Sequence, residues 1–251
     1  FHFKNNYITF IKKKIFIMSE IKGIFAASMS IFDEKLTLDS KKTIKHAENL
    51  IDRGCHGVAI FGSTGQAQLI SVSEKINLLN NLSDNKYKDK YLIGTGLNSL
   101  AETINIMKIT MSLGFDKFLI MPPAYYKGNT DQGVFDFYSA LISSIPKIKI
   151  ILYNFEKLSG YKFSAEAVTK LVKTYPENII GCKDSSYNLF ENLKLQNFLM
   201  FPGSEAKLLK GLELGCSGCI SAVTNVTHSL ARKVFDDFEN QVSQSKNEKL
   251  I

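Results

Sequence analysis

Arginine is almost missing from this sequence, since Arg53 and Arg232 are the only two among 251 residues. The formal net charge of +7 would otherwise suit a nucleic-acid partner. Arginine is the residue that usually makes bidentate contacts with phosphates and bases. Four of the lysines lie in residues 1–17, which contain no acid. We therefore interpret the charge as a lysine-rich composition and expect no nucleic-acid partner.

Long apolar runs and clustered cysteines are absent too. No run of 18 apolar residues occurs, so we expect no membrane span. Four scattered cysteines are too few for a disulfide scaffold, which favours a cytoplasmic location. Residues 1–17 lack the apolar core and the cleavage site of a secretory signal. We interpret them as an N-terminal extension, disordered or not native, ahead of Met18.

Several motifs for metals, cofactors and nucleophiles are missing as well. The histidines are scattered, and the single C-x-x-C of residues 216–219 has no second pair, so zinc is disfavoured. No complete dinucleotide fingerprint and no G-x-S-x-G nucleophile turn occurs. We therefore expect neither a metal site nor an organic cofactor.

What the sequence does contain is an alternation of short apolar runs and amphipathic segments from Gly23 onward. Continuous apolar runs are typical of parallel strands buried on both faces. Eight strand–helix units, repeating about every 25 to 35 residues without a linker, predict one α/β domain over residues 18–251, a (β/α)8 TIM barrel. The predicted strands are Gly23–Ala27, Val58–Phe61, Tyr91–Thr95, Lys117–Met121, Lys149–Tyr153, Ile179–Lys183, Phe198–Phe201 and Gly218–Ser221. The predicted helices are Asp39–Arg53, Ser73–Asn81, Ser99–Leu113, Asp131–Ile145, Ser164–Tyr175, Leu189–Leu195, Glu205–Leu214 and His228–Asn240.

Catalytic groups of such barrels follow the carboxyl ends of the strands, which directs attention to Lys183. Lysine is almost never fully buried without a partner or a task. Desolvation at the barrel mouth would favour the neutral amine, which attacks carbonyl carbons. The alternative is an ordinary ion pair with Asp184 at the rim.

Other strand ends carry further polar groups. Ser63 and Thr64 stand in a glycine-flanked turn whose backbone N–H groups suit a carboxylate, although an ordinary turn fits as well. Tyr153 ends the fifth predicted strand, where a core-edge role with a wet hydroxyl is the alternative. Tyr126 lies in PPAYY after the fourth strand, a segment more typical of packing or an interface than of chemistry.

The ordered motifs GSTGQ, PPAYY, LYNFEKLSG, GCKDSS, PGSE and GCISAVTNV resemble the dihydrodipicolinate synthase/N-acetylneuraminate lyase family, from about Gly23 to Asn240. The resemblance implies a class I aldolase in which Lys183 forms an imine with a 2-keto acid and Tyr153 shuttles protons. It also implies that Thr64 takes part in a proton relay and that Tyr126 reaches into a neighbouring subunit, so that the protein is a homo-oligomer, a dimer or tetramer. The substrate-binding residues that it implies are Gly62, Ser63, Thr64, Leu158, Ser185, Gly203, Glu205 and Ile220.

Departures from the family pattern bear on the substrate. Leu158 stands where the synthase branch has an arginine, so the bidentate clamp for a carboxylate is missing. This disfavours condensation of pyruvate with aspartate semialdehyde, which remains an alternative, and LSG is more similar to the lyase branch. The single acid Glu205, and Ala222 in place of a hydroxyl residue, disfavour sialic acid itself. Tyr187 stands where the family often has glycine.

We therefore expect a 2-keto-3-deoxy sugar acid, or another hydroxylated 2-keto acid, as the substrate. A non-catalytic 2-keto acid sensor is the alternative of another class. Family members usually continue into C-terminal helices, and we expect this chain to lack them.

Overall fold

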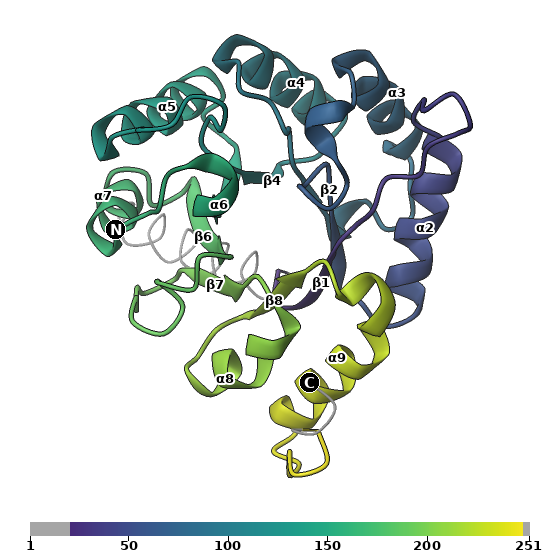
Figure 1. Cartoon of the computed structure of the whole chain (residues 1–251), viewed down its shortest axis with the longest axis vertical. Coiled ribbons are helices and arrows are strands. Elements are labelled where there is room, and N and C mark those ends of the chain that lie inside the picture. The colour runs from purple at the N-terminus through teal and green to yellow at the C-terminus, as the bar shows by residue number, and fades with distance from the viewer. Residues whose placement is uncertain (1–20, 248–251) are drawn as a thin grey trace, which may run out of the picture.

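The computed structural model describes residues 21–247, and these form a ring of strands surrounded by helices (Figure 1). All paired strands are parallel, and the ladder runs in the order β7-β6-β5-β4-β3-β2-β1-β8. At the remaining seam the Ser217 N–H donates to the Met200 carbonyl at 2.8 Å. The fold is therefore the predicted (β/α)8 barrel. Its strands are β1 Gly23–Ala27, β2 Gly57–Ile60, β3 Tyr91–Ile93, β4 Lys117–Ile120, β5 Lys149–Asn154, β6 Ile179–Asp184, β7 Leu199–Pro202 and β8 Gly218–Ser221.

The helices lie outside the ring and alternate with the strands along the chain (Figure 1). Side-chain oxygens of Asp39, Ser71, Ser99, Thr130 and Ser164 cap five of them by accepting a hydrogen bond from a first-turn N–H. The α-helices are α2 Ser40–Asp52, α3 Val72–Leu82, α4 Leu100–Ser112, α5 Asp131–Ser144, α6 Glu156–Ser159, α7 Ala165–Thr174, α8 Leu208–Glu213 and α9 Thr224–Glu239.

Alternation along the strands separates the apolar core inside the ring from the apolar packing outside it. The larger core lies between the strands and the outer helices and includes Ile150, Leu152 and Cys182. The smaller one fills the inside of the ring and includes Ile151 and Tyr153 from the same strand, β5. Because successive side chains of a strand point to opposite faces, a residue's parity decides whether it faces the barrel interior.

One predicted helix, Leu189–Leu195, is wrong: this segment forms a turn followed by irregular chain. The Leu189 and Phe190 amides donate to the Asp184 carboxylate, at 2.8 and 3.0 Å, so the start of this segment belongs to the turn that wraps around that carboxylate. The structure also contains α6, which we did not predict. The last helix begins at Thr224, four residues before its predicted start.

No helix within residues 21–247 is long and apolar enough to cross a membrane. The expected N-terminal extension, residues 1–17, lies outside the described residues.

Candidate active site

Lys183 lies on β6 inside the barrel mouth and is only 4% exposed. Its Nζ atom stands 4.2 Å from the ring centroid of Tyr153, its neighbour in the β5–β6 ladder. Within the described residues no hydrogen bond or ion pair engages this amine. The amine is therefore held against an aromatic ring and left available to a ligand.

A β-bulge on β6 determines the direction in which Lys183 points. Ile150 pairs with Ile179, but the next residue of β5, Ile151, pairs with Gly181, so Ile180 is an extra residue on β6. Tyr153 faces inward and pairs with Lys183 beyond the bulge, so both side chains share the barrel interior. Bulges often re-aim side chains next to active sites, and this one reverses the parity of the residues that follow it.

The alternative partner of Lys183, Asp184, faces the other way. Its fully buried carboxylate accepts five hydrogen bonds of 2.8 to 3.2 Å. One comes from the Asn154 side chain, and four come from the backbone amides of Ser186, Tyr187, Leu189 and Phe190. Asp184 therefore folds the loop after β6 into a compact turn and makes no ion pair with Lys183.

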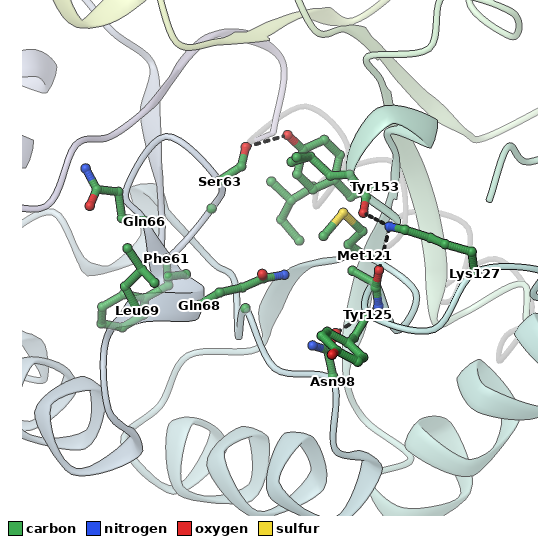
Figure 2. Close-up of a pocket in the computed structure, with 16 residues that line it drawn as sticks. Phe61, Ser63, Gln66, Gln68, Leu69, Asn98, Met121, Tyr125, Lys127 and Tyr153 are labelled. Atoms are coloured by element: carbon green, nitrogen blue, oxygen red, sulfur yellow. Dashed lines mark hydrogen bonds between the residues drawn. The ribbon is translucent and has the colours of Figure 1, made fainter. Parts of the chain in front are cut away.

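Tyr153 and Ser63 connect two strand ends. A hydrogen bond of 2.9 Å joins the Tyr153 hydroxyl and the Ser63 Oγ, and Figure 2 shows the two groups directed toward each other. Ser63 comes from the turn after β2 and Tyr153 from the end of β5. The pair thus bridges the mouth and offers a path by which a proton could leave or reach the Tyr153 oxygen.

A cavity of about 380 Å³ opens over Lys183. Ser185 and Gly203 lie tightly together at its wall, because a Cβ atom on Gly203 would be 2.1 Å from the Ser185 Oγ. Six residues predicted for the site line this cavity: Ser63, Thr64, Tyr153, Lys183, Ser185 and Gly203. The other lining residues are Phe155, Glu156, Lys157, Ser186, Tyr187 and Ala222.

A second cavity, of about 520 Å³, adjoins the first and shares Ser63 and Tyr153 with it. Gly62 and Leu158 line this second cavity and are absent from the wall of the lysine cavity. Figure 2 shows Gln68 extending into it. The Ser63–Tyr153 hydrogen bond therefore lies where the two cavities meet.

Three predicted site residues lie elsewhere. Glu205 is 5% exposed, and its carboxylate accepts hydrogen bonds from the hydroxyls of Thr224 and Thr227 in α9. Ile220 is fully buried in the apolar interior of the barrel. Tyr126 is 82% exposed and lines neither cavity of its own chain.

Sequence reasoning missed Phe155, Glu156, Lys157 and Ser186 as cavity residues. Their positions in the sequence could have indicated this role, since the first three directly follow the end of β5 and Ser186 comes shortly after β6. The short helix α6 turns Glu156 and Lys157 toward the cavity, and its first amide donates to the Ser186 hydroxyl at 2.9 Å.

The cysteines do not contribute to this site. Cys182 precedes Lys183 but packs in the outer core, where burial raises the pKa of its thiol well above the usual range. Burial also raises the pKa of the Cys216 thiol to about 11. Among residues 21–247 no three His, Cys, Asp or Glu side chains are grouped as metal ligands would be.

Fold and site together define the class of protein. The chain belongs to the dihydrodipicolinate synthetase family, whose model matches residues 20–251. This is a family of class I, pyruvate-dependent aldolases and synthases.

Relatives within this family carry different names. A 4-hydroxy-tetrahydrodipicolinate synthase of Listeria monocytogenes is 33% identical over 207 residues, 79% of this chain and 69% of the relative. A 2-keto 3-deoxygluconate aldolase from Picrophilus torridus is structurally similar, with a TM-score of 0.82 and 25% identity over 92% of this chain and 83% of that one. A catalytic lysine mutant of the sialic acid aldolase of Ruminococcus gnavus has a TM-score of 0.82 at 18% identity, over 89% of this chain and 74% of that one. This similarity concerns the fold alone.

Proposed function

We propose that this protein is a carbon–carbon lyase that forms an imine between Lys183 and pyruvate or a 2-keto-3-deoxy acid. The observation that carries the proposal is the inward-facing Lys183 amine, 4.2 Å from the Tyr153 ring, in a cavity of about 380 Å³. Lysine nucleophiles of this kind need a desolvated amine that is free to react and a proton carrier nearby. The buried Lys183 and the adjacent Tyr153 supply these at the mouth of the barrel.

The reaction begins when the neutral Lys183 amine attacks C2 of the keto acid and water leaves. The cationic imine then draws the C3–C4 bonding electrons into an enamine. Tyr153 takes the C4 hydroxyl proton, the aldehyde departs, and the Ser63 hydrogen bond supports the relay. Protonation at C3 and hydrolysis of the imine release pyruvate and restore Lys183; condensation is the reverse path.

The substrate carboxylate is assigned to the turn after β2. Ser63 and Thr64 line the lysine cavity and supply hydroxyls beside backbone N–H groups. Ser185, through its hydroxyl, and Gly203 line the same cavity and complete the proposed binding wall.

A hydroxylated 2-keto acid is the preferred substrate. Leu158 places an apolar side chain where an arginine clamp would be needed for the carboxylate of aspartate semialdehyde. The structural likeness to the Picrophilus torridus aldolase supports this preference, whereas the Listeria monocytogenes relative, with its printed synthase name, supports the alternative. Condensation of pyruvate with aspartate semialdehyde at a useful rate would make the synthase reaction the preferred proposal.

The proposed oligomer follows from Tyr126. Its side chain is 82% exposed and packs edge-to-face on Tyr125, with ring centroids 5.1 Å apart. A tyrosine from a second copy could reach the Ser63–Tyr153 pair through the adjoining cavity of about 520 Å³. We therefore propose a homodimer or tetramer, placed in the cytoplasm, where its four free thiols remain reduced.

The decisive experiment is trapping with pyruvate and borohydride, followed by intact mass and peptide mapping. We expect one irreversible adduct, on Lys183, and none in Lys183→Ala. An unmodified, folded wild-type protein would overturn the proposal. Trapping without turnover of any aldehyde would favour the sensor instead.

A further inference from the structure

The lysine cavity has an uneven charge distribution along the wall that α6 contributes. Glu156 and Lys157 are both exposed and line this cavity. Glu156 is the only carboxylate among the lining residues, and its Oε2 atom is 3.0 Å from the Lys162 ammonium. The carboxylate is therefore partly neutralised, and the cavity is left with a positive character.

Three lysines lie on or beside α6, and two of them have hydrogen-bond or ion-pair partners. Lys127 donates to the carbonyl oxygens of Ala124 and Leu158, at 2.7 and 2.8 Å, and so ties the loop after β4 to α6 (Figure 2). Lys162 pairs with Glu156. Lys157 makes no hydrogen bond or ion pair with any residue that the structure describes, although it lines the cavity.

We infer that Lys157 binds a second anionic group, a carboxylate or a phosphate, on the aldehyde half of the substrate. The inference rests on the proposed function, because Lys183, Ser63 and Thr64 hold the 2-keto acid end. Arginine binds a carboxylate through two parallel N–H groups of its planar guanidinium. Lysine carries a compact charge on a flexible side chain and can therefore bind a carboxylate or a phosphate without that bidentate geometry. The substrate class is therefore a hydroxylated 2-keto acid with a second anion at its far end, which cleaves to pyruvate and an anionic aldehyde.

Lys157 is on this view a specificity residue and takes no part in bond making. Its removal should weaken the binding of the aldehyde and leave the pyruvate imine intact. The contribution should also fall with ionic strength, because an exposed charge pair is screened by salt.

The test compares wild type, Lys157→Ala, Lys157→Arg and the control Lys173→Ala, an exposed lysine of α7 away from this cavity. Each reacts pyruvate with three aldehydes of different charge: glyceraldehyde, glyceraldehyde 3-phosphate and succinate semialdehyde. Borohydride trapping of pyruvate is measured in parallel on the same whole chain.

We expect Lys157→Ala to lower kcat/KM for at least one anionic aldehyde about tenfold, mostly through KM for the aldehyde. Glyceraldehyde should change by less than about twofold, Lys157→Arg should retain most of the activity, and Lys173→Ala should match wild type. Phosphate and carboxylate are distinguished by which anionic aldehyde loses more.

If Lys157→Ala affected neutral and anionic aldehydes equally, or had no effect, the inference would be overturned. Trapping of pyruvate at Lys183 would in that case still uphold the proposed function. Weaker trapping of pyruvate in Lys157→Ala would also overturn it, because Lys157 would then hold the keto acid. Absence of trapping in wild type would refute the proposed function and this inference with it.

Discussion

Two buried lysines of this barrel, Lys75 and Lys183, differ in what surrounds their amines. Lys183 is 4% exposed and faces a cavity, a tyrosine ring and a relay. Lys75 is 0% exposed and is buried on α3 together with Leu78, Leu79 and Leu82. Its Nζ atom is one of the buried polar atoms that find no hydrogen-bond partner within the described residues. Burial lowers the pKa of Lys75 to about 8.

The comparison shows that burial alone does not make a lysine a candidate nucleophile. Lys75 lines neither of the two cavities beside Tyr153, so no ketone can approach it there. Lys183 has a cavity for the ketone and a tyrosine for the proton. The predictions below test this contrast, beginning with the largest effect.

Lys183→Ala should lower kcat/KM by at least about 10³-fold, because it removes the buried amine that forms the imine. Lys75→Ala should change it by less than about threefold. Steady-state release of pyruvate measures both. A large loss from Lys75→Ala in a folded protein would break the contrast between the two lysines.

Tyr153→Phe should lower kcat about 10²- to 10⁴-fold, because it removes the proton carrier and keeps the ring against Lys183. Ser63→Ala, which removes only the hydrogen bond to that hydroxyl, should cost less, about tenfold. Single-turnover kinetics with a 2-keto-3-deoxy acid separate the bond cleavage from imine formation. A smaller effect for Tyr153→Phe than for Ser63→Ala would contradict the relay.

Asp184→Asn should lower the free energy of unfolding by about 2–4 kcal/mol, because an amide cannot accept all five hydrogen bonds. The control is Asp136→Asn, since Asp136 is exposed on α5 and accepts from Gln132. Denaturant unfolding at neutral pH measures both variants. Equal stability of the two would mean that the loop after β6 does not depend on the charge of Asp184.

Lys75→Met should raise the free energy of unfolding at pH 7 by about 1–3 kcal/mol, because the folded state no longer buries an unpaired cation. The folded pKa of about 8 lies below the unfolded value of 10.5, so the unfolded chain binds more protons between these values. The free-energy cost of burying the Lys75 cation is therefore full below pH 8 and falls as the pH rises toward 10.5. The free energy of unfolding of the wild type should therefore rise relative to that of Lys75→Met over this range. A constant difference between the two from pH 7 to 10 would show that the charge of Lys75 does not cause the difference in stability.

The sequence predicts best the features that depend on parity and position. Apolar runs place the strands, and Lys183, Tyr153 and Ser63 follow as polar residues at or just after strand ends. Residues 189–195 have an apolar spacing that suits a helix, yet their first residues belong to the turn that wraps around the Asp184 carboxylate, a contact that is not visible as a sequence pattern. Glu205 fails for a similar reason, since the hydroxyls of α9 hold it away from the lysine cavity.

The bulge at Ile180 makes the pairing register of β6 as important to the chemistry as its composition. If Ile180 paired regularly with Ile151, the alternation beyond it would turn Lys183 toward the outer helices and Cys182 toward the interior. Deleting Ile180 would instead leave a ladder without a bulge, in which Lys183 still pairs with Tyr153 and faces inward. A shift of register at this point would therefore inactivate the protein without replacing any candidate catalytic residue.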